Sequence, residues 1–287
     1  MPVLAQSMGL GLTDAERAFL AAHPVVRIGV DPEFAPFEFI DAEGEYQGLG
    51  SEYVQRVGEL LGIEFVVVPD LSWSEVVEKA FNREIDVLPC VGITEERKQL
   101  FDYSAPYLGF PRVIISRASD PYASLEEIAD VRVAVQGNSS HHGWITDNTD
   151  IEPGLYATFR EALLAVAEGS ADVAIGNLAV SDHTMRGLGL TSLAITGLVS
   201  TEVSPLAFAV RNDWPELATA ITKALAAIPE DEKQSIQRQW VPVEVLVAEA
   251  SASEEAGPDY IAYALFTAGA LIVGIALGIV LVWILRG

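Results

Sequence analysis

The sequence predicts an α/β protein of two lobes that is followed by one transmembrane helix. Short apolar strands alternate with amphipathic helices from about residue 25, and the same alternation restarts near Val131. The third observation is an uncharged, mainly apolar run at residues 261–285, because about 20 such residues span a bilayer. We therefore expect two doubly wound sheets joined by a hinge, with one helix crossing the membrane at the C-terminal end.

The 287 residues divide into six expected segments, which follow from the element order and the local composition. An acidic stretch of low complexity separates the second α/β unit from the membrane helix. The segments are a lead-in helix and its preceding residues (1–23), the first part of lobe 1 (24–113), lobe 2 (114–199), the return to lobe 1 (200–245), the acidic linker (246–259) and the transmembrane helix (260–286).

Helix caps and periodicity define the elements of the first unit. Thr13 and Glu16 have the spacing of a capping box, so the lead-in helix begins there and ends by Pro24. Ser72 is the expected N-cap of a later helix. The expected order is then a strand at 25–30, a second strand that ends in a turn at Glu43-Gly44, a helix at 51–62 that stops at glycine, a strand at 63–70, a helix at 72–85 and a strand at 86–93.

The second unit repeats this order and then returns to helices. A strand at 131–138 ends in a turn, and the run 158–177 predicts a helix, a glycine stop and a strand. Two further strands are expected at 193–197 and 204–211. Residues 213–240 predict two helices that are separated near Pro229.

Charge and ligand-type residues exclude several classes of function. The chain has 17 basic and 41 acidic residues, a net charge of −24, and so acidic a surface repels nucleic acid. The single cysteine, Cys90, cannot form an internal disulfide and is expected to be a small buried side chain. His141 and His142 lack a third ligand, so we expect no metal and no cofactor, and we place this pair in a loop beside a cleft.

The stretch VGITEERKQLFDYSAPY contains a candidate anion site. Thr94 follows an apolar strand and is a candidate helix N-cap, and Arg97 comes three residues later. Unpaired backbone N–H groups at a helix N-terminus and a guanidinium together suit a carboxylate from outside the chain. The alternative is that Thr94 is a plain cap and that Arg97 pairs with an acid of its own segment, namely Glu95, Glu96 or Asp102.

Five motifs in a fixed order carry a family resemblance. They are VDPEFAPFEF…DAEGEYQGLGSEYV, LSWSEVVEKAFNREIDVLPCVGITEER, FDYSAPY, VAVQGN and EALLAVAEGSADVAIGN. Over residues 24–240 the chain resembles the family 3 extracellular solute-binding proteins, which are amino-acid receptors of ABC importers. The lead-in LTDAERAFLAAHP and the membrane helix make it similar to the Venus-flytrap sensor ectodomains of bacterial two-component kinases. The resemblance implies a bilobed, periplasmic-binding-protein-like fold of type II.

In lobe 1, the resemblance implies a carboxylate site around Arg97. Arg97 would grip the ligand carboxylate, with Thr94 and Gly92 beside it. Asp31, at the end of the first strand, would line the cleft.

The resemblance also implies an aromatic sandwich around the ligand. Phe34 and Trp73 would hold the ligand side chain between them, and core packing is their alternative role. Core packing is the expected role of Phe37 and Phe39.

From lobe 2, Gln136 and Asn177 would reach the ligand, together with the backbone of residues 137–140 and with Ser140. Two departures from the family pattern affect the ligand's amine. Family amino-acid binders usually carry an acid where Asn177 stands, and a second threonine that helps to hold the amine is absent near Thr94. Both departures weaken amine recognition, so we expect a small carboxylate, aromatic or heterocyclic in character, that need not be an α-amino acid.

The membrane segment predicts a location and a further contact. Arg286 follows the apolar run and acidic residues precede it, so we expect a single-pass protein of the cytoplasmic membrane with its C-terminus inside and its lobes periplasmic or extracellular. The opening MPVLAQS resembles the end of an export signal, which suggests a misassigned start or a fragment. A cytosolic domain with a tail anchor is the alternative. Gly274 and Gly278 have the spacing of a helix-pairing motif, which suggests a homodimer.

These inferences favour a membrane-anchored receptor that binds a small carboxylate or amino-acid-like ligand between its lobes and signals to a sensor kinase module. The first alternative is a membrane-tethered substrate-binding component that delivers solute to an ABC permease. The second alternative is an enzyme of the same fold, similar to dehydratases. No acid–base pair is apparent in the sequence, so we expect a binding protein and no enzyme.

Overall fold

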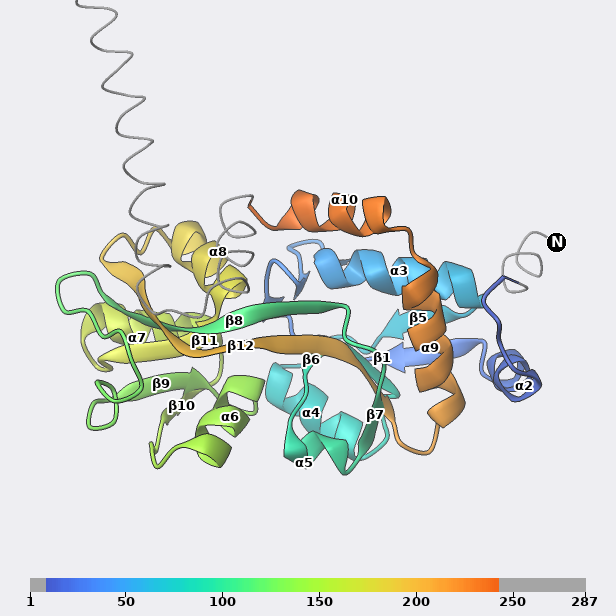
Figure 1. Cartoon of the computed structure of the whole chain (residues 1–287), viewed down its shortest axis with the longest axis horizontal. Helices are drawn as coiled ribbons and strands as arrows, with labels where there is room; N and C mark the ends of the chain where they lie inside the picture. Colours follow the sequence, from blue (N-terminus) through green and yellow to red (C-terminus); the bar gives the residue numbers. More distant parts are fainter. Residues whose placement is uncertain (1–8, 243–287) are drawn as a thin grey trace, which may run out of the picture.

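A computed structural model describes residues 9–242, and these residues form two α/β lobes side by side (Figure 1). The predicted linker and transmembrane helix at 246–286, with Gly274 and Gly278, lie outside the described residues. Within residues 9–242, no helix combines the length and the apolar character that crossing a membrane requires.

Lobe 1 contains the N-terminal elements and the last two helices of the described chain. The lead-in helix packs against the first of those two helices. In chain order its elements are α2 (Asp14–Ala22), β1 (Val25–Ile28), β2 (Glu33–Phe34), β3 (Glu38–Ile40), β4 (Tyr46–Gln47), α3 (Leu49–Leu61), β5 (Glu64–Val67), α4 (Trp73–Phe81), β6 (Val87–Gly92), α5 (Glu95–Lys98), β7 (Phe101–Tyr103), α9 (Pro215–Ala227) and α10 (Glu230–Trp240).

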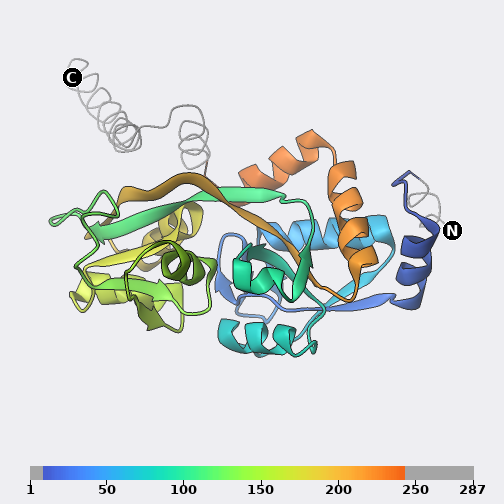
Figure 2. The same ribbon diagram turned by 60° about the horizontal axis from the view of Figure 1, so that its bottom comes forward.

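Lobe 2 lies at the other end of the molecule, and two long strands connect it to lobe 1 (Figures 1 and 2). The connecting strands are β8 (Leu108–Arg117) and β12 (Leu193–Arg211). The elements of lobe 2 are β9 (Val133–Gln136), α6 (Ser140–Asn148), β10 (Gly154–Tyr156), α7 (Phe159–Glu168), β11 (Val173–Asn177) and α8 (Leu178–Leu188).

The connecting strands correct the prediction of two separate sheets. Within residues 9–242, nine strands form one sheet in the order β10-β9-β11-β8-β12-β6-β1-β5, with β7 paired to β12, and β2-β3-β4 form a small second sheet. The two strands expected at 193–197 and 204–211 are parts of β12, whose pairing with β8 shifts register between Leu198 and Val203. The expected segment boundaries at 113/114 and 199/200 fall inside β8 and inside this irregular part of β12.

Local signals in the sequence fix several helix ends as predicted. Thr13 and Glu16 form the capping box of α2, and Ser72 and Glu75 form the equivalent box of α4. Gly62 ends α3 in the left-handed conformation, which glycine adopts without steric cost. The predicted break near Pro229 separates α9 from α10.

Two helices of lobe 2 were not predicted from the sequence. Residues 140–148 form α6, so the expected loop at His141 and His142 is wrong. Helix α6 buries only His141 and Ile145 and therefore has no apolar stripe that a periodicity test could find. Helix α8 follows β11 without a loop, and Asn177 is at once the last residue of the strand and the cap of the helix.

Aromatic residues fill the core of lobe 1 where it meets the connecting strands. Phe37 is fully buried and lies 5.0 Å from Phe110 of β8, measured between ring centroids. Phe39 is partly buried and contacts Trp240 of α10. Both aromatic residues therefore have the packing role that the sequence suggested.

Candidate ligand-binding site

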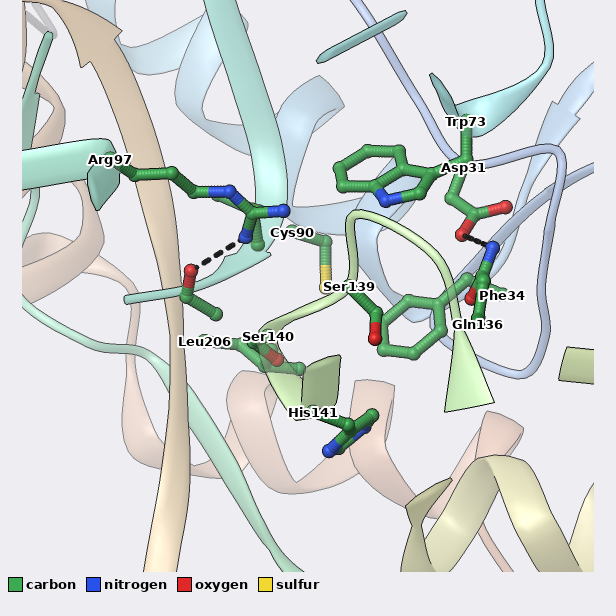
Figure 3. A pocket seen from close by; sticks show the side chains of 12 residues that line it. Asp31, Phe34, Trp73, Cys90, Arg97, Gln136, Ser139, Ser140, His141 and Leu206 are labelled. Atoms are coloured by element: carbon green, nitrogen blue, oxygen red, sulfur yellow. Dashed lines mark hydrogen bonds between the residues drawn. The ribbon is translucent and has the colours of Figure 1, made fainter. Parts of the chain in front are cut away.

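A small cavity of about 30 Å³ lies where the two lobes meet (Figure 3). Elements of both lobes and the connecting strand β12 contribute to its wall. The lining residues are Asp31, Phe34, Trp73, Cys90, Val91, Gly92, Arg97, Gln136, Ser139, Ser140, His141 and Leu206. The volume suits one or two water molecules, so a ligand of several heavy atoms enters only when the lobes separate or the lobe 2 loop moves.

Arg97 is the buried cation at one end of this cavity. Its side chain is 4% exposed, and burial lowers its pKa. One Nη donates to the carbonyl of Gly92 at 2.9 Å, and the other donates to the carbonyl of Asn138 at 2.6 Å. The guanidinium also lies 5.4 Å from the ring centroid of Trp73. Among the side chains that the structure describes, no carboxylate forms an ion pair with Arg97, while the neighbouring Lys98 pairs with Glu95.

The turn after β9 joins lobe 2 to the Arg97 site. Asn138 has a positive φ of 57°, and its carbonyl accepts from Trp73 Nε1 at 3.1 Å as well as from Arg97. Its side-chain amide donates to Ser74 Oγ at 3.2 Å. One carbonyl of lobe 2 thus occupies the donors of lobe 1 that would suit a ligand carboxylate.

A second contact between the lobes joins Asp31 to Gln136. The Gln136 amide donates to Asp31 Oδ2 at 3.0 Å, and the Glu33 backbone donates to Oδ1 at 3.0 Å. Burial raises the Asp31 pKa to about 6. Glu38, which accepts from the Asp31 backbone at 2.9 Å and from the Tyr46 hydroxyl at 3.2 Å, has a pKa raised well above its usual value, also by burial.

A second buried cation, Arg112, lies behind His141 on the connecting strand β8. Its Nε donates to His141 Nδ1 at 3.0 Å, and one Nη donates to Ser204 Oγ at 3.3 Å. Burial lowers the Arg112 pKa to about 10, and burial together with the two guanidiniums lowers the His141 pKa well below its usual value. His141 is therefore a neutral imidazole at neutral pH.

Seven of the nine residues that the resemblance implied are gathered around one cavity. They are Asp31, Phe34, Trp73, Gly92, Arg97, Gln136 and Ser140. Thr94 caps α5 through its hydroxyl and lines a neighbouring groove between α4, α5 and α6. Asn177 does not line the cavity, because its Oδ1 caps α8 by accepting from the backbone of Ala179 and Val180.

Sequence reasoning missed several residues of this site. Cys90 is buried as expected, yet it also lines the cavity. His141 and Leu206 line it too. A signal for Arg112 was present, because an arginine inside the apolar run LGFPRVIIS indicates a buried charge.

No group of three or more His, Cys, Asp or Glu residues suited to a metal occurs in the part of the chain that the structure describes.

Gly92 permits the close approach of the lobes, which leads to a testable prediction. A Cβ at Gly92 would lie 2.4 Å from both Cβ and Oγ of Ser140 in lobe 2. We expect Gly92→Ala to destabilise the closed arrangement by about 1–3 kcal/mol, as overpacking does, and Ser140→Gly to restore most of that loss in the double variant. Thermal melting of both single variants and the double variant completes a double-mutant cycle. Strictly additive losses would contradict this contact.

Comparisons with known proteins agree with this geometry. The family model described as bacterial extracellular solute-binding proteins, family 3, matches residues 26–243. The chain is similar to the virulence sensor protein BvgS of Bordetella pertussis, with 26% identity over 228 residues, which cover 78% of this chain and 18% of BvgS. It is also similar to the histidine-binding periplasmic protein of Escherichia coli, with 25% identity over 256 residues, which cover 80% of this chain and 92% of that protein.

A solved structure supports the fold. The crystal structure of a histidine kinase sensor domain with similarity to periplasmic binding proteins matches with a TM-score of 0.71 and 24% identity, and the match covers 77% of this chain and 97% of that domain. At this identity the likeness establishes the bilobed fold. The family model confirms the resemblance indicated by the sequence motifs, and this structure confirms the fold that the resemblance implied.

Proposed function

Because the chain belongs to the bacterial extracellular solute-binding proteins, family 3, we propose that its cleft binds a small carboxylate ligand as a sensory signal. The chain is a solute-binding Venus-flytrap domain that is related to amino-acid-binding proteins and to sensor ectodomains. The ligand class, the membrane anchor and the signalling role are the proposed parts.

The observation that carries this proposal is the environment of Arg97. Its buried guanidinium donates to two backbone carbonyls, one from each lobe, and forms no ion pair within the described residues. A carboxylate accepts two parallel N–H groups of one guanidinium and also balances its charge, whereas a backbone carbonyl accepts a hydrogen bond without balancing the charge. Arg97 therefore suits a ligand carboxylate better than it suits the Asn138 carbonyl.

The same contacts supply a way to transmit binding. Asn138, Gln136 and Ser140 of lobe 2 meet Trp73, Asp31 and Gly92 of lobe 1 across the cavity. A ligand that prefers one arrangement of the lobes shifts the equilibrium between open and closed forms. In the proposed receptor, the acidic linker and the helix predicted at 260–286 carry this shift across the cytoplasmic membrane to a sensor kinase module. Similarity to BvgS and to a kinase sensor domain supports this reading.

A ligand screen tests the proposed ligand class. The purified full-length chain is kept in a mild detergent, because residues 260–286 are predicted to enter a bilayer, and is melted with amino acids and with small mono- and dicarboxylates. A ligand that binds the native state raises the melting temperature by mass action. We expect carboxylates to raise it and their uncharged amides to leave it unchanged. A set of ligands in which the amides stabilise as well as the acids would contradict the carboxylate assignment.

The alternative of an ABC importer component has one observation in its favour, the similarity to the histidine-binding periplasmic protein over most of both chains. The two roles differ in their partners. Crosslinking of the ligand-loaded chain in its native membrane, followed by mass spectrometry, would identify a permease for import and a kinase for sensing.

Mass spectrometry of the ligand after incubation tests the dehydratase-like alternative, because that alternative requires turnover.

A further inference from the structure

The second buried arginine extends the proposed function, and the inference below rests on that function. Arg112 is 5% exposed and lies in β8, at the level where the connecting strands enter lobe 2. Its hydrogen-bond partners are a histidine and a serine, and its guanidinium lies 4.8 Å from the ring centroid of Trp144. No carboxylate of the described chain pairs with it. An uncompensated buried charge is costly, so a folded protein that keeps one has a use for it.

Strand register places Arg112 beside the cavity that Arg97 borders. Ser204 and Leu206 are two residues apart in β12, so their side chains lie on the same face of the sheet. Leu206 lines the cavity, and Ser204 accepts the hydrogen bond from Arg112. His141 bridges the same gap, because it lines the cavity and contacts Arg112. Arg112 is thus separated from the cavity by one layer of side chains.

The polar groups at this corner are donors. His141 Nδ1 accepts from Arg112 Nε, so the neutral ring carries its proton on Nε2, and this N–H has no hydrogen-bond partner among the described side chains and backbone groups. One Nη of Arg112 also lacks a hydrogen-bond partner among them. These N–H groups can donate hydrogen bonds to an anion, and the positive charge of Arg112 repels an ammonium group.

Strand β11, one of the two strands that flank β8, does not compensate the charge of Arg112. Asn177 of β11 is the register partner of Arg112, and its side-chain oxygen caps α8. The cavity's own carboxylate, Asp31, contacts Gln136 instead of Arg112. Arg97 therefore lines the cavity and Arg112 lies behind His141, and neither arginine has an ion pair among the described side chains.

We propose that the ligand carries two acidic groups, one held by Arg97 and the other by Arg112 together with His141. The chemical class is a short dicarboxylate, whether a simple diacid or an acidic amino acid. Both sources share the same pair of carboxylates, and they differ in whether an ammonium group is present.

Matched pairs of ligands test the proposal on the purified full-length chain. Isothermal titration compares butanoate with succinate and glutamine with glutamate. A charge-assisted hydrogen bond to a buried group corresponds to about a tenfold to hundredfold gain in affinity, so we expect the second acid to strengthen binding by at least about tenfold. Preference for succinate over glutamate identifies a simple diacid, and the reverse order identifies an acidic amino acid.

Variants of Arg112 assign the gain to this residue. We expect Arg112→Gln to bind succinate no more tightly than butanoate, and Arg112→Lys to keep part of the preference for succinate. Arg117→Gln is the control on the same strand, because Arg117 donates to the carbonyls of Val166 and Ala171 and forms an ion pair with Asp172. It should lower stability and leave the diacid preference intact.

A melting experiment without ligand gives an independent outcome. If Arg112 is retained for a ligand, Arg112→Met removes a costly buried charge, and the melting temperature is unchanged or higher. A melting temperature several degrees lower than that of the wild type would show that Arg112 stabilises the fold, and this result would overturn the proposal. Equal affinity for mono- and diacids, with binding still dependent on Arg97, would overturn this inference and leave the carboxylate receptor standing. Binding of no carboxylate at all would overturn both.

Discussion

Replacing Arg97 with methionine is expected to abolish carboxylate binding while the chain remains folded. Arg97 is buried in the cleft, and no carboxylate of the described residues balances its charge. Methionine has a similar length and removes a buried charge whose desolvation is costly, while the carbonyls of Gly92 and Asn138 lose this donor. A bidentate contact supplies two charge-assisted hydrogen bonds, each of about 1.5–3 kcal/mol, so affinity should fall by at least about a hundredfold.

The neighbouring Lys98 provides the matched control for this experiment. Lys98 lies on the same short helix, is half exposed and pairs with Glu95. Lys98→Met removes one positive charge from the same segment, and exposed ion pairs of this kind contribute about 1 kcal/mol or less. Isothermal titration with the best ligand of the screen should show unchanged affinity for Lys98→Met. Equal losses in the two variants would mean that Arg97 acts only through the general charge of the segment.

Much of the fold was predictable because its signals are local. The capping boxes at Thr13 and Ser72 and the glycine stop at Gly62 each fix one helix end through contacts within a few residues. The joining of both lobes into one sheet was not predictable, because it depends on pairing between residues about 90 positions apart, such as Phe110 with Ser204. Pro111 also weakened the signal of β8, because proline disfavours a central strand.

The position of Pro111 shows how the structure accommodates it. Pairing of β11 with β8 covers only residues from Arg112 onward, and Pro111 lies opposite Val203, where the register of β12 changes. The proline thus marks the point at which a strand leaves one neighbour.

The part of the candidate site that lies in the family motifs was predictable from the sequence. Motif order placed Arg97, Trp73 and Gln136 in one cleft, and the structure brings them to one cavity. The role of Asn138 was not visible, because its backbone carbonyl makes the contacts with Trp73 and Arg97. A carbonyl's direction depends on the turn and on the docking of the lobes, and residue type does not encode it.

Closure of the lobes should strengthen as pH falls through about 6, because of Asp31. Burial raises the pKa of Asp31 from 3.8 to about 6 in the closed arrangement, whereas an exposed Asp31 in a separated form would titrate near its ordinary value. The closed form then binds a proton at Asp31 more tightly than the separated form does, so protonation favours closure. Above about pH 6 Asp31 is charged in both forms, and closure then includes the free-energy cost of burying a carboxylate. Roughly two pKa units correspond to at most about a hundredfold change in the equilibrium.

The groups around Asp31 determine which control variant isolates its contribution to the pH dependence of closure. Asp31 faces Glu33 of β2, Glu38 of β3 and Gln136 of β9. Burial also raises the pKa of Glu38 well above its usual value. Glu38 is buried and does not line the cavity between the lobes, so its surroundings should change little when the lobes separate, and Glu38→Gln is the matched control for Asp31→Asn.

Distances between spin labels at the exposed Glu59 of lobe 1 and Glu152 of lobe 2 measure the closed population directly. We expect wild type and Glu38→Gln to close more at pH 5 than at pH 8. Asp31→Asn imitates the protonated acid, and Gln136 can turn its amide to accept from Asn at that position. This variant should be closed to the same extent at both pH values. If it keeps the wild-type pH dependence, another group titrates between the lobes, and the contact of Asp31 with Gln136 does not control their closure.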